Sequence, residues 1–436
     1  MANLEKGNFK LINAWAFYDW ANSVYSLVIA TAVFPIYYES ITSENDGIVS
    51  FFGTEFHNST LLSYSLSFSF LIVAFLSPLL SGIADYTGNK KRFMQFFCYL
   101  GSLSVMALFF FDGVENLWIG IVFTILASIG FWGSIVFYNS YLPEIAFPEQ
   151  QDRVSAKGFM YGYSGSILLL AFNLAMIMKP DLFGITDPTL PARISFLMVG
   201  IWWIGFAQVT FYYLPFNTVE KKEGTNFIFK GIHELLIILK SLKELNSLKQ
   251  FLIAFFLYSI GVQTIILLAG IYGKKELGIE SNKLIITILL IQVVAIFGAF
   301  VFARISERIG NIKTLKLTIA IWGLICFAAF LLDAHNKYLD LQFYTLGGVI
   351  GMVLGAIQSL SRSTYSKLLP ETEDHATYFS FFDVTEKLAI VLGTFIFGFV
   401  GSITDSLKNS IFILAVFFLL GYIVLSFMKK NEIISK

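Results

Sequence analysis

The chain has 436 residues, of which 56% are hydrophobic and 14% are charged, and its mean hydropathy is +0.71. So few charged residues could not cover the surface of a soluble protein of this length. The composition therefore predicts a membrane protein instead of two or three soluble domains. The 30 Lys and Arg residues balance the 30 Asp and Glu residues, which excludes the basic surface that nucleic-acid binding requires.

Twelve apolar runs are long enough to cross a bilayer, because a helix rises about 1.5 Å per residue and about 20 residues therefore span the hydrocarbon. The expected spans in the first half are 12–38, 60–83, 93–111, 117–141, 158–178 and 192–214. Those in the second half are 249–272, 284–303, 314–333, 341–361, 376–401 and 409–428. The first run is too long for a signal-peptide core and has no small-residue cleavage site, so we expect it to remain as a span.

A long polar stretch, Pro215–Leu248, separates the two sets of spans. It contains the charged run Glu220–Glu223 and then the amphipathic segment Phe227–Leu245, which we expect to lie along the membrane surface. The predicted architecture is all-α, with twelve transmembrane helices in two pseudo-symmetric six-helix bundles. These bundles are residues 1–214 and 249–436, and the stretch 215–248 is a cytoplasmic linker between them.

Two motifs recur about half the chain length apart. The polar turn Ser81–Arg92 has an echo in Ala303–Lys316, in which Asp85 matches Glu307, Gly88 matches Gly310, and Asn89 matches Asn311. The tripeptide Leu142–Glu144 returns as Leu369–Glu371. Such echoes indicate a duplicated unit, and parallel membrane repeats of this kind build one large class of transporters.

The Lys and Arg residues outside the spans predict the orientation. Most of them fall on one side of the predicted membrane, which the positive-inside rule assigns to the cytoplasm. The first loop on the other side, Glu39–Ser59, contains neither Lys nor Arg. Because the number of spans is even, we expect a multi-pass protein of the cell membrane with both termini in the cytoplasm.

The first span contains a polar stripe. Asp19, Asn22, Ser23 and Ser26 are spaced so that they share one helix face. A carboxylate at this depth is costly in lipid and should face protein or water. Asp19 either caps the entry of the span or faces a central solute pathway. In the second case its partner is an amino group of the solute, Arg362 or Lys387.

Further polar groups lie in spans 4 and 10. Tyr138 and Asn139 close span 4, where a Tyr can equally belong to an interfacial belt. Gln358 lies at the end of span 10, and Arg362 follows one turn later. The expected substrate pathway is lined by Asp19, Asn22, Ser23, Tyr138, Asn139, Gln358 and Arg362.

Span 11 is the most heavily charged, with Asp383, Glu386 and Lys387 in its first half. Asp383 and Lys387 are four residues apart and can pair within the helix. Glu386 points about 100° away from Lys387 around the helix and is left needing another partner. These three residues are candidates for proton coupling or for an intramembrane ion pair, and Glu386 is the expected proton carrier.

The polar turns are expected to gate the protein without binding the solute. The gating loop comprises Asp85, Gly88 and Arg92 with their counterparts Glu307 and Gly310. Asp85 is expected to approach the N-terminus of span 11, where free backbone N–H groups favour an anion. Arg92 can anchor the same junction.

No enzyme signature is present in the sequence. The four His residues have no ligand-like spacing, and no nucleophile elbow or phosphate-binding loop occurs. Cys98 and Cys326 lie inside apolar runs, where packing is expected. We therefore expect no metal and no cofactor, and any active transport must draw on a gradient.

Several of these stretches resemble known families. Gly82–Arg92 resembles the loop that major facilitator superfamily transporters carry between spans 2 and 3, although Tyr86 replaces a commonly basic residue. Four stretches along the whole chain resemble the vacuole effluxer-like family, whose fungal members export amino acids from the vacuole during autophagy. These are Tyr18–Ser23, Tyr138–Glu144, Gln358–Ser363, and Phe382–Val384 with Lys387.

This resemblance implies the major facilitator fold, in which spans 1, 4, 7 and 10 line a central cavity. We expect a monomeric secondary transporter that exports or exchanges a small polar solute, such as amino acids, with protons as the coupling ion. One alternative is import of a sugar or organic anion by the same fold. The other is a non-transporting membrane scaffold or sensor, which would not need the aligned polar residues.

Overall fold

The computed structural model describes residues 4–216, 227–242 and 244–428. Within these ranges, twelve helical segments are long and apolar enough to cross a membrane, which confirms the predicted number of spans. The charged run Glu220–Glu223 lies outside the described residues.

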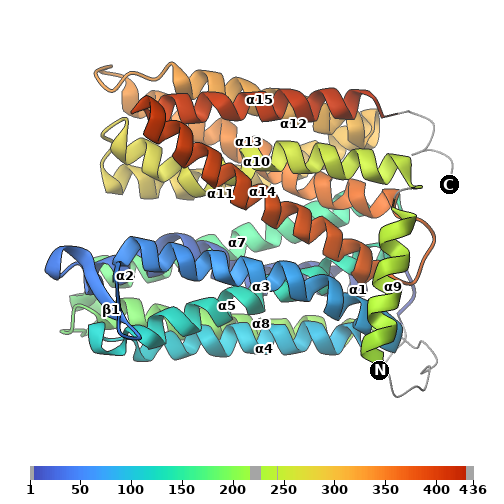
Figure 1. The fold of residues 1–436 in the computed structure, drawn as a ribbon, viewed down its shortest axis with the longest axis horizontal. Coiled ribbons are helices and arrows are strands. Elements are labelled where there is room, and N and C mark those ends of the chain that lie inside the picture. The colour runs from blue at the N-terminus through green and yellow to red at the C-terminus, as the bar shows by residue number, and fades with distance from the viewer. Residues whose placement is uncertain (1–3, 217–226, 243, 429–436) are drawn as a thin grey trace.

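The spans form two bundles of six (Figure 1). The N-terminal bundle, coloured blue to green, contains α1 (Phe9–Val24), η1 (Tyr25–Val33), α2 (Phe34–Thr42), α3 (Asn58–Thr87), α4 (Lys90–Ala107), η3 (Leu108–Phe110), η4 (Val114–Asn116), α5 (Leu117–Ser140), α6 (Leu142–Ile145), α7 (Gln151–Met178), η5 (Pro180–Phe183) and α8 (Leu190–Tyr213). The C-terminal bundle, yellow to red, contains α10 (Asn246–Lys275), α11 (Ser281–Ile309), α12 (Asn311–Phe330), α13 (Leu339–Leu368), α14 (His375–Thr404) and α15 (Leu407–Ser426).

Each bundle has its own core of buried apolar side chains. The first core runs from Leu11 to Leu214 and takes in Ala376 of α14. The second runs from Ile238 to Leu425. Two separate cores allow each bundle to move as a unit, because packed interiors transmit displacement and resist internal deformation.

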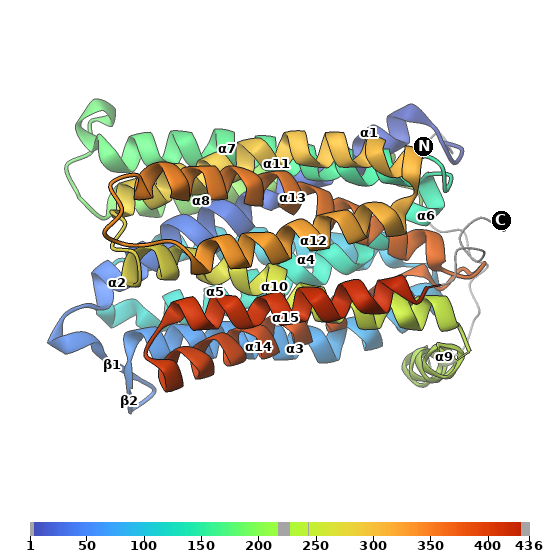
Figure 2. The same cartoon turned by 90° about the horizontal axis from the view of Figure 1, so that it is seen from above.

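The two ends of the bundles differ (Figures 1 and 2). α9 (Phe227–Ser241) lies across one end, which we call the α9 end. A hairpin of β1 (Ile48–Phe51) and β2 (Thr54–His57) lies at the other, which we call the hairpin end. α1 begins and α15 finishes at the α9 end, as an even number of spans requires.

Three spans extend further at the α9 end than predicted. α7 begins at Gln151, α11 ends at Ile309 and α13 ends at Leu368, whereas the predicted limits were 158, 303 and 361. The extra turns carry polar and charged residues. Hydropathy marks the apolar part of a helix, and the backbone can continue the helix beyond the hydrocarbon.

The first span changes its hydrogen-bonding register near its middle. The residues Tyr25–Val33 form a π-helix, and Pro35 follows in the first turn of α2. A proline has no N–H and its ring crowds the preceding turn, so a register change upstream relieves the conflict. Ser26, which a regular helix would align with Asp19, is exposed.

The first loop at the hairpin end is more ordered than predicted. Short 3₁₀ turn η2 (Asn45–Gly47) leads into the β1–β2 hairpin, which the acidic composition of the loop did not suggest. Phe52 and Gly53 form its two-residue turn with φ of 49° and 81°. Positive φ at both central residues is typical of the tight turns that match the twist of a hairpin.

Candidate functional site

Hydrogen bonds and ion pairs connect the two bundles from the α9 end into the middle of the spans. They join α3 and α6 to α14, α7 to α11 and α13, and α1 and α5 to α13. The predicted site residues fall into three groups along this interface. One surrounds Arg362, one surrounds Lys387, and one closes the α9 end.

The guanidinium of Arg362 is the centre of the first group. It projects from α13 of the C-terminal bundle and is buried against the N-terminal bundle. Its Nη1 atom donates to Asp19 Oδ2 at 3.3 Å and to Asn139 Oδ1 at 3.2 Å. Its Nε and Nη2 atoms donate to the Ser155 hydroxyl at 2.9 Å and the Ser155 carbonyl at 2.8 Å. Of the partners considered for Asp19, which were a solute amino group, Arg362 and Lys387, the structure shows Arg362.

Asp19 is buried and is held by a second donor besides Arg362. The Tyr138 hydroxyl donates to Asp19 Oδ2 at 2.8 Å. Trp15 stacks on the Tyr138 ring with centroids 4.4 Å apart, and its Nε1 atom donates to the Tyr138 carbonyl at 2.8 Å. Because these partners lie in the bundle interior, Tyr138 does not belong to an interfacial belt and Asp19 does not cap the entry of its helix.

Gly158 of α7 lets the helices approach closely enough for this pair to form. A Cβ atom at Gly158 would lie 2.4 Å from Asp19 Oδ2, 2.9 Å from Arg362 Nη2 and 2.9 Å from the Tyr138 hydroxyl. Any side chain larger than glycine would therefore have to displace charged groups.

The other predicted pathway residues have different surroundings. Ser23 is half-buried, and its hydroxyl donates to Asn22 Oδ1 at 3.4 Å. The Asn22 Nδ2 atom is buried with no hydrogen-bond partner among the described residues. Gln358 accepts a hydrogen bond of 2.5 Å from Tyr163 of α7, again across the bundles. Asn22 therefore retains an unused donor close to the interface.

Lys387 is the centre of the second group. Its Nζ atom lies 2.8 Å from Asp383 Oδ1, which confirms the predicted pair within the helix. It also lies 3.6 Å from Glu386 Oε2 and 3.3 Å from the ring centroid of Trp132 on α5. The prediction that Glu386 points away from Lys387 is wrong, because the long lysine chain reaches both carboxylates. The further partner of Glu386 is Gln263, whose Nε2 atom donates at 2.7 Å.

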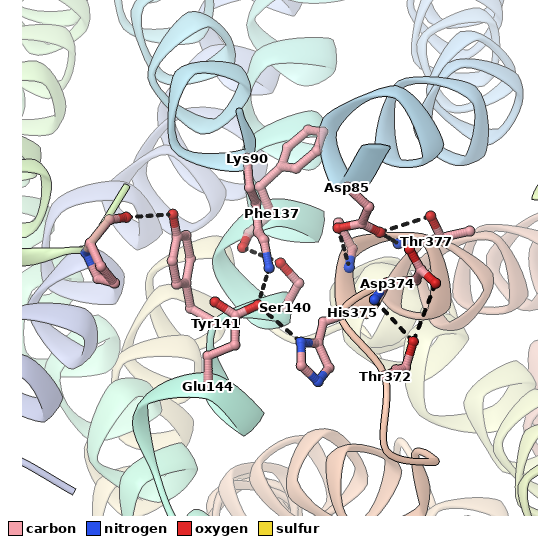
Figure 3. A network of polar contacts seen from close by, with 12 residues as sticks. Asp85, Lys90, Phe137, Ser140, Tyr141, Glu144, Thr372, Asp374, His375 and Thr377 are labelled. Atoms are coloured by element: carbon pink, nitrogen blue, oxygen red, sulfur yellow. Dashed lines mark hydrogen bonds and ion pairs between the residues drawn. The ribbon is translucent and has the colours of Figure 1, made fainter. Parts of the chain in front are cut away.

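Asp85 lies at the α9 end against the N-terminus of α14, the position predicted for it (Figure 3). Its carboxylate accepts from the backbone N–H groups of Ala376 at 3.3 Å and Thr377 at 2.7 Å, and from the Thr377 hydroxyl at 2.8 Å. These N–H groups belong to the first turn of α14, which has no partners for them within the helix. Gly88 ends α3 with a φ of 64°, a left-handed conformation that glycine adopts without strain.

The prediction that Arg92 anchors this junction is wrong, because the Arg92 side chain is exposed. Lys90 takes that place, since it lies two residues earlier and so on the inward face of α4 (Figure 3). Buried Lys90 pairs with Glu144 of α6, and Glu144 Oε1 lies 3.0 Å from Nδ1 of His375. Glu144 thus connects the N-terminal bundle to the start of α14.

The repeated motif forms a second junction, between α11 and α7. Glu307 pairs with Arg153 in the first turn of α7. Buried Asp152 accepts from the Ser306 hydroxyl at 2.5 Å and from Asn311 Nδ2 at 2.7 Å. Gly310 separates α11 from α12 with a φ of 89°. The echo predicted Glu307 as the counterpart of Asp85, but the buried acceptor is Asp152, in the first turn of the opposite helix.

Several residues of the interface were absent from the predicted site. Trp15, Ser155 and Phe159 surround Arg362, and Lys90 with His375 surround Glu144. An aromatic, a serine or a histidine beside an apolar run carries no signal of its own. The repetition of Leu142–Glu144 was the one sequence feature that could have pointed to Glu144.

The sequence is similar to one family along nearly its whole length. The profile described as vacuole effluxer Atg22-like matches residues 8–433. A Bacillus subtilis protein named as the MFS-type transporter YxiO is 32% identical and covers 96% of this chain and 95% of its own. Autophagy-related protein 22-1 of Penicillium rubens is 22% identical over 85% of this chain and 75% of its own.

Solved structures share the fold. The major facilitator transporter FucP in its outward conformation matches with a TM-score of 0.70 and 13% identity, covering 97% of this chain and 98% of its own. A bacterial homologue of the iron transporter ferroportin in an outward-facing state matches with a TM-score of 0.66 and 14% identity, covering 96% of this chain and 98% of its own. The predicted architecture of two six-helix bundles is therefore confirmed.

Proposed function

Because the chain belongs to the Atg22-like vacuole effluxer family, within the major facilitator superfamily, we propose that it exports or exchanges a small polar solute, such as an amino acid, by alternating access. The observation that carries this proposal is the buried contact between Asp19 and Arg362. Each residue belongs to a different bundle, so separation of the bundles at the α9 end must expose both charges. A scaffold would gain nothing from a charged pair on such a moving surface.

We place the protein in the cell membrane with the α9 end in the cytoplasm. The excess of Lys and Arg on that side supports this orientation. The conformation is then closed toward the cytoplasm by the Asp85, Glu144 and Arg362 contacts. Both solved transporters described above were captured facing outward, which agrees with this assignment.

Proton coupling is supported by the balance of charge around Lys387. This lysine contacts two carboxylates, Asp383 and Glu386, so the cluster carries one negative charge more than positive when all three are ionised. An uncompensated charge between membrane helices is costly. Binding of one proton neutralises the excess, and Glu386 is its proposed carrier because it is the more exposed carboxylate of the two.

The test is transport in proteoliposomes under an imposed pH gradient. Glu386→Gln keeps the acceptor for Gln263 but cannot exchange a proton. We expect net accumulation to lose its dependence on the gradient while solute exchange continues. Unchanged gradient dependence would rule out Glu386 as the carrier. Loss of exchange as well would mean that Glu386 contacts the solute.

A further inference from the structure

The groups around the Arg362 guanidinium all come from the opposite bundle. Its hydrogen-bond acceptors lie on α1, α5 and α7, and so do three aromatic rings. We call this set the cation cage. It consists of Trp15, Asp19, Tyr138, Asn139, Ser155 and Phe159.

The cage matches a guanidinium on its edge and on its face. An arginine has five N–H donors, and the cage presents a carboxylate, an amide oxygen, a hydroxyl and a backbone carbonyl to them. The centre of the guanidinium lies 4.2 Å from the Phe159 ring centroid, 4.9 Å from that of Trp15 and 5.4 Å from that of Tyr138. Aromatic rings with one carboxylate are a known combination for binding organic cations.

Arg362 is attached to the other bundle, so it cannot stay in the cage when the bundles separate. The cage would then keep its negative charge and its three rings but have no cation. Such a site is costly if it remains empty, because the Asp19 carboxylate loses its buried partner. Water, or a cation from the newly opened side, must take the place of Arg362.

We propose that the cation cage is a binding site for the cationic group of a solute, either a guanidinium or a primary ammonium, which alternates with Arg362. Arg362 then acts as a tethered competitor that expels the solute cation when the bundles close. This inference rests on the proposed transport function for its role. The binding itself can be measured without transport.

The experiment removes the competitor. In purified Arg362→Ala, the cage has no internal cation, and methylguanidinium chloride should produce a saturable rise in the midpoint of thermal unfolding. Methylammonium chloride tests the ammonium arm, while methylurea and sodium chloride control for shape and ionic strength. Wild-type protein should respond much less, because Arg362 already occupies the cage.

Matched variants assign the effect to the cage. Adding Asp19→Asn to Arg362→Ala should weaken methylguanidinium binding by about tenfold or more, since Asn keeps an acceptor but removes the carboxylate charge that pairs with the cation. Arg193→Ala removes an arginine that lies near two carboxylates, Asp112 and Asp187, within the N-terminal bundle, and should create no response. Should Arg362→Ala fail to fold, Arg362→Gln can replace it, because Gln keeps a donor for Asp19.

Absence of a saturable response in a folded Arg362 variant would overturn the proposal. An equal response in the Asp19→Asn double variant, or in Arg193→Ala, would also overturn it, because binding would then lie elsewhere. These outcomes do not depend on solute movement. A failure of the proposed transport function would instead appear as no flux in wild-type protein, whatever the cage binds.

Discussion

Asp19 and Arg362 form the contact on which the proposed mechanism depends most. Both side chains are buried, and removal of one partner from a buried pair typically costs about 3–5 kcal/mol. Each bundle has a separate core, so this cost should fall on the closed conformation more than on folding.

We expect Asp19→Asn to reduce transport by about tenfold or more. A tenfold change corresponds to about 1.4 kcal/mol, which is less than the cost of about 3–5 kcal/mol for removing one partner of a buried pair. Asn keeps the size of Asp and an acceptor for Tyr138, so expression and membrane insertion should persist. Flux in proteoliposomes, with the thermal midpoint of the purified protein as a control for folding, measures both effects. Wild-type flux would show that the pair only stabilises the structure.

Gly158 provides a second test at the residue scale. Gly158→Ala places a methyl group against Asp19, Arg362 and Tyr138, so the pair must separate. We expect increased labelling from the cytoplasmic side at cysteines introduced near the α9 end. Gly205→Ala is a matched control, because its Cβ would meet nothing within 4 Å. Equal labelling in the two variants would contradict the role given to Gly158.

Residue types predicted much of this site, but their partners could not be predicted. The cost of a charge in lipid singled out Asp19, Glu386 and Lys387 from the sequence alone, whereas Arg362 was noted for its position one turn after Gln358. Lys90, and not Arg92, anchors the junction because Lys90 lies on the face of α4 that turns inward. The apolar run alone does not reveal which face that is. The Ser155 and Phe159 contacts depend on the approach of α7 to α13, far apart in the sequence.

At the scale of elements, α3 and α14 meet through a carboxylate placed on a helix N-terminus. An anion in this position is stabilised by about 0.3–1 kcal/mol at a surface and up to about 2 kcal/mol when partly buried. The junction is therefore strong enough to bias the closed state and weak enough to open during a transport cycle.

We expect Asp85→Asn to slow turnover several-fold while solute affinity changes little, because the residue lies at the α9 end and away from the Arg362 and Lys387 groups. Asn can still accept from Thr377 but lacks the charge. Initial rates of transport and equilibrium binding of the solute, measured on the same preparation, separate the two quantities. Lost affinity with an unchanged maximal rate would instead place Asp85 in the solute site.

The helices themselves were predictable because hydropathy and length act locally. The interruption of the first span was harder to foresee, since the π-helix at Tyr25–Val33 begins well before Pro35. The hairpin at Ile48–His57 rests on one two-residue turn within an acidic loop. In both cases the local structure depends on a single residue or a pair of residues, which forms no repeating pattern along the sequence.

At the scale of the whole molecule, internal repetition explains why the α9 end closes at two places. α3 meets α14, and α11 meets α7, so the same pairing of spans occurs once in each half, although the buried carboxylate lies on α3 in one junction and on α7 in the other. The sequence echo predicted this duplication. It could not predict which end is closed, because that depends on contacts between halves of the chain that no local pattern encodes.

The most direct test of the account is efflux from proteoliposomes loaded with an equimolar mixture of the twenty protein amino acids together with neutral sugars. Mass spectrometry of the outer solution would identify each solute released. We predict release of at least one amino acid by wild-type protein, with little release by Asp19→Asn and no selective release of sugars. Release of sugars alone, or identical profiles for wild-type and Asp19→Asn protein, would contradict the account.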